Sequence, residues 1–288
     1  MHPAARDVYH SHIDPSDILL TDQVAIVTGG GGGIGLGTAL GLARFGADVA
    51  VLDIVPDRCA AAVAAIEELG RRALGIPCDV SLSDQVRATI ADVFLQWGRV
   101  DILINNAGGV RAGPFLTQPE ASMRRHVDIN LMSALVATQE AARCMIEGGR
   151  GGAIVNVASI EGSRAAPSYA VYAACKAAML NFARTTAVEL GDHGIRINCI
   201  SPDKTITPGL LGNRTGSLDP APWPEPGPGL SAGIPLGRPG LVDECAAAAV
   251  WLCSKMSSYV TGVNIPVDGG TWASGGWTRG ADGSWVLP

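Results

Sequence analysis

The sequence predicts an α/β protein, a single doubly wound domain with about seven parallel strands and helices on both faces of the sheet. Two observations predict this class. Short segments that are apolar at nearly every position recur along the chain, as expected of strands covered on both faces. Alanine-rich helical patterns separate them, and an alternation of strand and helix implies right-handed crossovers between parallel strands.

The predicted strands are short and rich in Val, Ile, Leu and Ala. They cover residues 24–28, 48–53, 72–77, 101–105, 153–159 and 195–201, with a short last strand near 263–267. The helical patterns cover about residues 34–46, 57–69, 83–97, 117–146, 167–191 and 241–254. Apart from this alternation the chain shows no internal repeat, and no second domain is predicted.

Composition and charge exclude several function classes. The chain has 288 residues, of which 47% are hydrophobic and 17% charged, which is enough apolar surface for a large core. A net charge of −6 offers no basic surface for nucleic acid or for an anionic membrane. The N-terminus lacks a targeting pattern, and no apolar segment approaches the ~18 residues that span a bilayer. We therefore expect a cytoplasmic protein.

The cysteines and histidines predict neither disulfides nor a metal centre. The seven cysteines are widely spaced and include no Cys-x-x-Cys pair. Three of the five histidines stand within the first 12 residues, where a solvated tail is expected. We therefore expect no bound metal.

The chain divides into three unequal parts. Residues 1–21 are an irregular lead-in, residues 22–270 form the main domain, and residues 271–288 are a tail with three tryptophans among glycines. Within the main domain, residues 204–236 interrupt the alternation, and a proline at every second position from 220 to 228 disfavours helix there. We expect a substrate loop or lid. Its apolar residues favour an apolar or cyclic substrate: Leu210, Leu211, Leu218, Trp223, Leu230 and Ile234.

A glycine-rich segment joins the first predicted strand to the first predicted helix. Residues 28–35 read TGGGGGIG. A helix N-terminus offers unpaired N–H groups and the positive end of the helix dipole, which suits a pyrophosphate, and glycine allows a close approach. This context predicts dinucleotide binding.

Asp53 ends the second predicted strand, twenty residues after Gly33. A carboxylate at this position accepts hydrogen bonds from the adenosine ribose hydroxyls and repels a 2′-phosphate. Neither Gly32 nor Ile54 supplies a cation, and Arg58 is an awkward candidate, so the sequence predicts NAD in preference to NADP.

Two tyrosines precede one lysine in YAVYAACK, residues 169–176. On a helix, Tyr172 lies one turn and Tyr169 two turns before Lys176, so all three are expected on the same face. A tyrosine with its usual pKa of about 10 is a poor base near neutrality, and a lysine ammonium one turn away is expected to lower that pKa. The pattern therefore predicts proton transfer by a tyrosine.

Taken together, the motifs resemble the short-chain dehydrogenase/reductase family over about residues 22–270. The family's TGxxxGxG motif matches Thr28, Gly29, Gly33 and Gly35. Its NNAG motif matches residues 105–108, and its adenine-flanking Asp–Val pair matches Asp79 and Val80. Its active-site asparagine, serine, tyrosine and lysine match Asn130, Ser159, Tyr172 and Lys176.

The resemblance implies a Rossmann-type fold and hydride transfer between NAD and a secondary alcohol or ketone. Tyr172 would be the general acid/base, Ser159 would hydrogen-bond the substrate oxygen, Lys176 would bind the nicotinamide ribose, and Asn130 would hold a water linking Lys176 to solvent. The implied cofactor-binding residues are Gly29, Gly33, Ile34, Gly35, Asp53, Asp79, Val80, Asn106, Ala107, Gly108, Tyr172, Lys176 and Thr207. A homotetramer is also implied, with residues 117–146 and 167–191 pairing between subunits.

Three alternatives stay open at this point. Tyrosine seven residues before lysine is the spacing of the family's enoyl reductases, so Tyr169 is a rival to Tyr172; those enzymes usually depart from the NNAG and glycine patterns that are intact here. A non-catalytic dinucleotide sensor typically loses the Tyr/Lys pair. A sugar-nucleotide epimerase or dehydratase uses another glycine spacing and a larger C-terminal domain.

One segment departs from the family pattern. Residues 201–208 read SPDKTITP, and Asp203 stands where the family usually has glycine. Without the conformational freedom of glycine, the backbone is expected to turn differently there. This departure bears on Thr207, which matches a threonine that contacts the nicotinamide carboxamide in the family.

Overall fold

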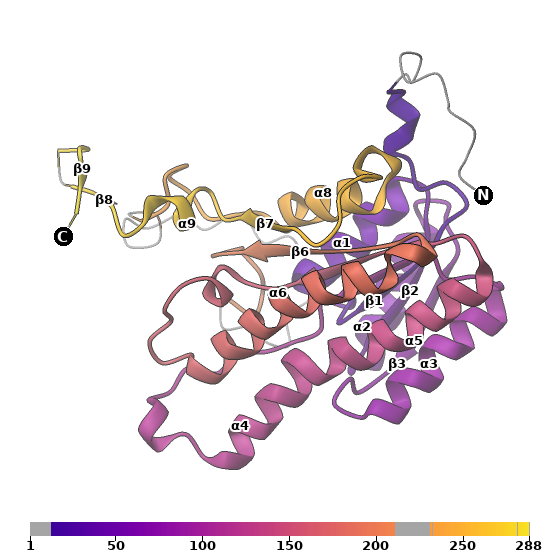
Figure 1. Ribbon diagram of the computed structural model, residues 1–288, viewed down its shortest axis with the longest axis horizontal. Helices are drawn as coiled ribbons and strands as arrows, with labels where there is room; N and C mark the ends of the chain where they lie inside the picture. The colour runs from indigo at the N-terminus through magenta and orange to yellow at the C-terminus, as the bar shows by residue number, and fades with distance from the viewer. Residues whose placement is uncertain (1–12, 211–230, 232, 281, 288) are drawn as a thin grey trace.

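The computed structural model describes residues 13–210, 231, 233–280 and 282–287. Seven parallel strands form one sheet in the order β3-β2-β1-β4-β5-β6-β7, with helices on both faces, as the sequence predicts (Figure 1). The direction of winding reverses between β1 and β4. In open sheets of this kind, ligands bind in the crevice outside the carboxyl ends of the strands at this reversal.

The strands begin and end within two residues of their predicted bounds. They are β1 Val24–Thr28, β2 Asp48–Asp53, β3 Ala73–Pro77, β4 Ile102–Asn105, β5 Gly152–Val157, β6 Ile195–Pro202 and β7 Asn264–Val267. All residues of β1, β2 and β4 are buried, which explains why these strands are apolar on both faces. In the tail, β8 Thr278–Arg279 and β9 Trp285–Val286 form a separate antiparallel hairpin.

Two apolar cores lie on opposite faces of the sheet, because alternate residues of a strand point to opposite sides. One core is covered by α1 Gly33–Arg44, α2 Pro56–Glu67 and α8 Val242–Cys253. The other is covered by α3 Ser83–Trp97, α5 Ser133–Gly148 and α6 Ala170–Leu190 (Figure 1). Within the described part of the chain, no helix is both long and apolar enough to cross a membrane.

The helix predicted over residues 117–146 forms over residues 120–148, and it contains a π-helical turn that the sequence did not predict. The chain forms α4 Glu120–Val127, a π-helical turn Asp128–Met132 (η3) and then α5. The start is later than predicted because Gln118, which precedes a proline, is held in an extended conformation with ψ 120°. π-turns are rare and occur frequently at functional sites, and this one contains the predicted site residue Asn130.

The helix predicted from residue 167 begins three residues later, at Ala170. Ser168 adopts a left-handed conformation with φ +72°, and Tyr169 is the N-cap with φ −123° and ψ 24°. Tyr169 therefore lies outside the helix, and the expectation that it shares the helical face of Tyr172 and Lys176 is wrong.

The carboxyl ends of the strands and the connections that follow them gather at one edge of the sheet, on the left in Figure 1. The proline-rich part of the expected lid, with Leu211, Leu218, Trp223 and Leu230, lies outside the described residues, as do residues 1–12 of the lead-in. Of the other expected lid residues, Ile234 is buried and Leu210 is about half exposed. A short helix, α9 Thr271–Ser274, follows β7 on the same edge.

Candidate active site

The glycine-rich turn after β1 is fastened to the NNAG segment after β4. The Asn106 side-chain amide donates to the carbonyl oxygens of Thr28 and Gly29, both at 3.0 Å. The Thr28 hydroxyl accepts hydrogen bonds from the backbone N–H groups of Asn106 and Ala107, also at 3.0 Å. These bonds join two segments nearly 80 residues apart in sequence into one rigid rim at the sheet reversal.

Glycine is required in this turn by geometry. Gly29 has φ +62°, a conformation that other residues adopt only at a cost. A Cβ on Gly35 would overlap the carbonyl oxygen of Gly29 and the side-chain nitrogen of Asn106. Helix α1 then begins at Gly33, and its N-cap, Gly32, provides no side-chain hydrogen bond. The first N–H groups of α1 are therefore left for a ligand.

Asp53 lies at the carboxyl end of β2, next to this turn. Its side chain is buried and accepts hydrogen bonds from the backbone N–H groups of Gly31 and Val55, both at 3.1 Å. Arg58 is closer than the sequence suggested: a Cβ built on Gly31 would lie 2.6 Å from Arg58 Cβ, and one on Gly32 would lie 4.0 Å from Arg58 Nη1. A carboxylate and a guanidinium thus both flank the predicted ribose position.

Asp79 and Val80 follow β3 at the same edge. Asp79 accepts hydrogen bonds from the backbone N–H and hydroxyl of Ser81, at 2.9 and 2.7 Å. The hydroxyl bond is the main reason that the pKa of Asp79 is lowered, with a smaller contribution from the charge of Arg125. Val80 packs against the core below. The pair therefore lies beside the carboxyl end of β2, which Asp53 ends.

Asn130 is fully buried in the π-turn and connects three segments. Its side-chain nitrogen donates to the carbonyl oxygens of Gly109 and His126, at 2.8 and 3.0 Å, and its side-chain oxygen accepts from Gly109 N–H at 3.1 Å. A Cβ on Gly108 would lie 2.7 Å from that oxygen, which explains the glycine of NNAG. The Asn130 amide therefore holds the loop after β4.

Ser159, Tyr172 and Lys176 meet at the end of β5. The Ser159 side chain lies close enough to Tyr172 to lower the pKa of the Tyr172 hydroxyl. Lys176 Nζ lies 5.6 Å from the centre of the Tyr172 ring and donates to the Val157 carbonyl oxygen at 2.8 Å. The structure thus brings together three of the four residues predicted to be catalytic, with Asn130 in the adjoining turn that packs against α6.

The expectation that Lys176 lowers the pKa of Tyr172 is wrong: in the folded protein the pKa of Tyr172 is raised. Burial raises the pKa of Tyr172; Ser159 lowers it, and the charge of Glu161 raises it further. Burial also lowers the pKa of Lys176, to about 8. The physical reason is that both groups share one buried environment, which disfavours the charged form of each.

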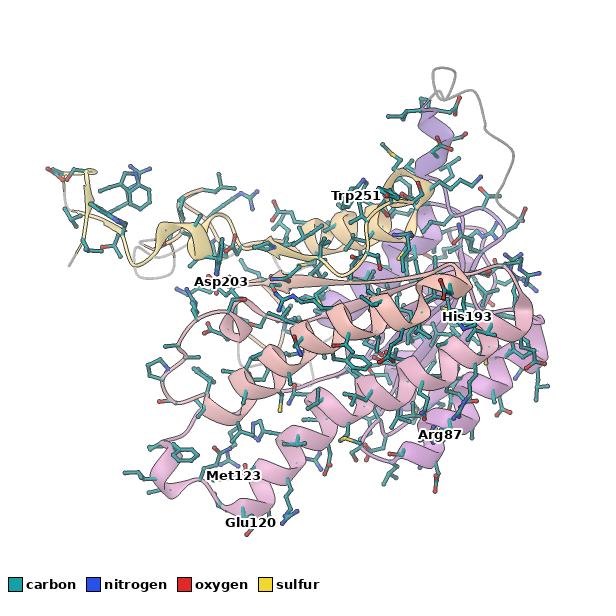
Figure 2. All side chains as sticks on the ribbon, viewed as in Figure 1. Arg87, Glu120, Met123, His193, Asp203 and Trp251 are labelled. Atoms are coloured by element: carbon teal, nitrogen blue, oxygen red, sulfur yellow. The ribbon has the colours of Figure 1, made fainter. Side chains whose placement is uncertain are left out.

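Thr207 lies over the glycine-rich turn, although 174 residues separate it from Gly33 in sequence. A Cβ on Gly33 would lie 3.4 Å from the Thr207 methyl group, and the Thr207 hydroxyl accepts a hydrogen bond from Leu210 N–H at 3.1 Å. The departure at Asp203 therefore leaves Thr207 near the expected cofactor position. Asp203 itself lies at the carboxyl end of β6, close to α9 (Figure 2).

Two groups at the site were missed from the sequence. Glu161 follows Ser159 by two residues, its N–H donates to the Ser159 hydroxyl at 3.2 Å, and its charge acts on Tyr172. His126 is buried; its Nδ1 bonds the Ser122 carbonyl, and its Nε2 accepts from Arg111 N–H at 3.3 Å. Glu161 and His126 stand close in sequence to Ser159 and Asn130, but closeness in sequence does not show where a side chain points.

Comparisons with known proteins agree with this geometry. Residues 29–271 match a family model described as enoyl-(acyl carrier protein) reductase. The chain is 36% identical over 256 residues to 3-oxoacyl-[acyl-carrier-protein] reductase FabG of Chlamydia muridarum, covering 88% of this chain and 98% of that protein. It is 35% identical over 267 residues to cyclohexanol dehydrogenase of a Rhodococcus species, covering 86% and 96%.

A solved structure is similar over nearly the whole chain. It is that of a 7α-hydroxysteroid dehydrogenase in complex with NADH and 7-oxo-glycochenodeoxycholic acid, with a TM-score of 0.82 and 33% sequence identity. The match covers 90% of this chain and 98% of that one. The similar proteins are thus oxidoreductases of one architecture with different substrates.

Proposed function

The chain belongs to the short-chain dehydrogenase/reductase family, and we propose that it transfers a hydride between NAD and a secondary alcohol or ketone, with Tyr172 as general acid/base. The observation that carries the proposal is the meeting of three side chains at the end of β5: Lys176 Nζ lies 5.6 Å from the centre of the Tyr172 ring, and Ser159 lowers the pKa of Tyr172. A paired serine and tyrosine can hold one oxygen of a substrate from two directions and exchange a proton with it.

The residues that follow β1 and β2 at the same edge of the sheet fit a nicotinamide dinucleotide. The glycine-rich turn, which tolerates no Cβ at Gly35, and the N-terminus of α1 suit a pyrophosphate. The buried carboxylate of Asp53 suits the ribose that follows it. When bound, the nicotinamide supplies or accepts the hydride. Asp53 supports NAD over NADP, because it would repel a 2′-phosphate, and Arg58 is the group that opposes this preference.

The protein's own part in the reaction is proton transfer and orientation. In reduction, Tyr172 donates its proton to the carbonyl oxygen; in oxidation, the phenolate accepts the hydroxyl proton while Ser159 holds the same oxygen. Because burial raises the pKa of Tyr172, the donating form dominates near neutrality. We therefore expect oxidation to become faster as the pH rises, and reduction to become slower.

An apolar or cyclic substrate is proposed. Support comes from relatives named for cyclohexanol and for a hydroxysteroid, and from the apolar composition of residues 204–236. The test is absorbance of reduced nicotinamide during incubation with NAD and a panel of alicyclic, acyclic and polyol alcohols. Faster turnover of the alicyclic alcohols is expected, and a preference for small polyols would overturn this part of the proposal.

The cofactor preference has its own test. Replacing Asp53 with asparagine removes the charge that faces the ribose, so kcat/KM with NADP should rise relative to that with NAD. Asp57→Asn, an exposed carboxylate at the start of α2, is the matched control and should leave the ratio unchanged. An unchanged ratio in Asp53→Asn would contradict the assignment of Asp53 to cofactor selection.

Enoyl reduction through Tyr169 is the second candidate, because the matching family model is described as an enoyl-(acyl carrier protein) reductase. Tyr169 is the N-cap of α6, three residues before Tyr172, and is 37% exposed. Consumption of NADH with a crotonyl thioester, lost in Tyr169→Phe, would favour this reaction over ketone reduction.

We also propose a homotetramer, supported by large apolar side chains exposed on the surface, among them Val188 on α6 and Trp272 and Trp277 in the tail. Sedimentation or light scattering should give about four times the 29.6 kDa chain mass. A monomeric mass would contradict it.

A further inference from the structure

The arginine of the loop between β5 and α6 is shared by two carboxylates from different elements. Arg164 Nη2 lies 2.8 Å from a Glu161 carboxylate oxygen and 3.7 Å from an Asp203 carboxylate oxygen. Its Nε also donates to Glu161, at 3.4 Å. Glu161 belongs to the turn that begins at Ser159, and Asp203 follows directly after β6. The three side chains therefore link the serine loop to the start of the substrate loop.

Asp203 lies in an unfavourable environment for a charge. Its side chain is 9% exposed, and its Oδ2 has no hydrogen-bond partner within the described residues. Burial raises the pKa of Asp203, and Thr271, Arg164 and Lys204 offset only part of that increase. A buried carboxylate that is incompletely paired destabilises a fold. Stability alone therefore gives no reason for this residue in place of the family's glycine.

The network also borders the reacting tyrosine. Glu161 is the carboxylate whose charge acts on Tyr172, and Arg164 is the cation that pairs with Glu161. The other titratable groups that act on these residues are Cys175 and Cys199, beside Lys176. The charges of Asp268 and Lys204 act on Arg164 and Asp203, respectively. The pKa of the Cys199 thiol is raised to about 12, so it is uncharged.

We propose that Arg164 and Asp203 are positioning residues: together with Glu161 they form an ion network that fixes the Ser159 loop against the end of β6 and balances the charge of Glu161 beside Tyr172. This inference rests on the proposed function. It adds two residues that act through Ser159 and Tyr172 rather than on the substrate, and it gives a reason for aspartate at position 203.

The pH profile of alcohol oxidation tests whether Arg164 balances the charge of Glu161. Arg164→Met leaves Glu161 unbalanced, so the midpoint of the rise in kcat should move up by about half a pH unit or more. Glu161→Gln should move it down, and the double variant should return it towards the wild type. Arg164→Lys keeps the charge and should restore most of the profile if Arg164→Met proves poorly folded.

A matched control separates this effect from general loss of an ion pair. Arg143 pairs with Glu140 on α5 at the same i, i+3 spacing, at 3.1 Å. Arg143→Met should leave the profile of kcat unchanged. If Arg164→Met shifts the midpoint no more than Arg143→Met does, the charge-balancing role is wrong.

Asp203→Asn tests whether the ion network fixes the Ser159 loop against the end of β6. Removing the buried charge should raise the melting temperature at pH 7, while kcat/KM falls several-fold because the serine loop loses its link to β6. A gain in stability with unchanged kinetic constants would overturn the positioning role of Asp203. Neither outcome bears on Tyr172: if Tyr172→Phe retains full turnover, the proposed function itself fails, whatever the network variants do.

Discussion

The two halves of the site edge are held together in different ways. Around β1, β2 and β4, the cofactor half is fixed by backbone groups: Asn106 bonds main-chain oxygens, Thr28 bonds main-chain N–H groups, and Asp53 accepts from two more. Around β5 and β6, the substrate half is fixed by side chains, through the hydrogen bond from Lys176 to the Val157 carbonyl and the Glu161–Arg164–Asp203 ion pairs.

This difference separates what is common to the family from what is particular to this chain. A pyrophosphate and a ribose demand the same backbone shape in every member, so glycines and short polar residues recur there. Side-chain contacts can vary with the substrate, and the departure at Asp203 lies in the substrate half. Substitutions in each half of the edge test this division.

Tyr172→Phe should lower kcat in both directions at least about a hundredfold, because it removes the group that exchanges the proton. NAD binding should change little, since phenylalanine keeps the ring of Tyr172 and only the hydroxyl is lost. Tyr169→Phe is the matched control, and its kcat should stay within a few-fold of the wild type while KM changes. Steady-state kinetics and NADH fluorescence titration measure both, and the reverse pattern would assign the chemistry to Tyr169.

Gly35→Ala should cost about 3 kcal/mol or more in free energy of unfolding, because the new methyl group overlaps Gly29 and Asn106 and cannot be relieved by a flexible side chain. Gly191→Ala, where a Cβ meets nothing within 4 Å and φ is −59°, should be neutral or slightly stabilising. Urea unfolding of both variants makes the comparison. Equal unfolding free energies for the two variants would show that the turn can move to accommodate a Cβ at position 35.

Lys176→Met should be inactive yet more stable than the wild type at pH 7. The folded protein lowers the pKa of Lys176 from 10.5 to about 8, so the buried ammonium destabilises the fold below pH 8, and this cost disappears as the pH rises to 10.5. The gain at pH 7 should be up to roughly 3 kcal/mol.

Buried thiols with raised pKa values, such as Cys199 and Cys253, act in the opposite direction in both proteins above pH 9. The quantity to compare is therefore the difference in unfolding free energy between variant and wild type, at pH 7 and at pH 10. A difference that does not shrink with pH would contradict the account of Lys176.

Thr28→Val has the smallest expected effect, a loss of about 1–2 kcal/mol in unfolding free energy, because the partly buried N–H groups of Asn106 and Ala107 lose their acceptor. Thr186→Val, whose hydroxyl bonds only carbonyls of its own helix, is the control and should change stability by a few tenths of a kcal/mol. Similar losses in both would weaken the view that the Thr28 hydroxyl joins the two segments.

The sequence predicted the sheet and the glycine-rich turn between β1 and α1 well because both depend on local rules. Fully buried strands are apolar at nearly every position, and the turn at Gly35 leaves no room for another residue. The π-turn at Asn130 and the left-handed Ser168 depend on tertiary packing, which no periodicity records. The raised pKa of Tyr172 and the contact between Arg164 and Asp203 depend on burial and on segments 39 residues apart.

A crystal structure of the chain with NAD and an unreactive analogue of a cyclic alcohol tests the central claim most directly. We expect the Ser159 and Tyr172 hydroxyls both to lie within hydrogen-bond distance of the analogue's oxygen, beside the nicotinamide. Finding the Tyr169 hydroxyl in that place, or the Tyr172 hydroxyl turned away from the nicotinamide ring, would contradict it.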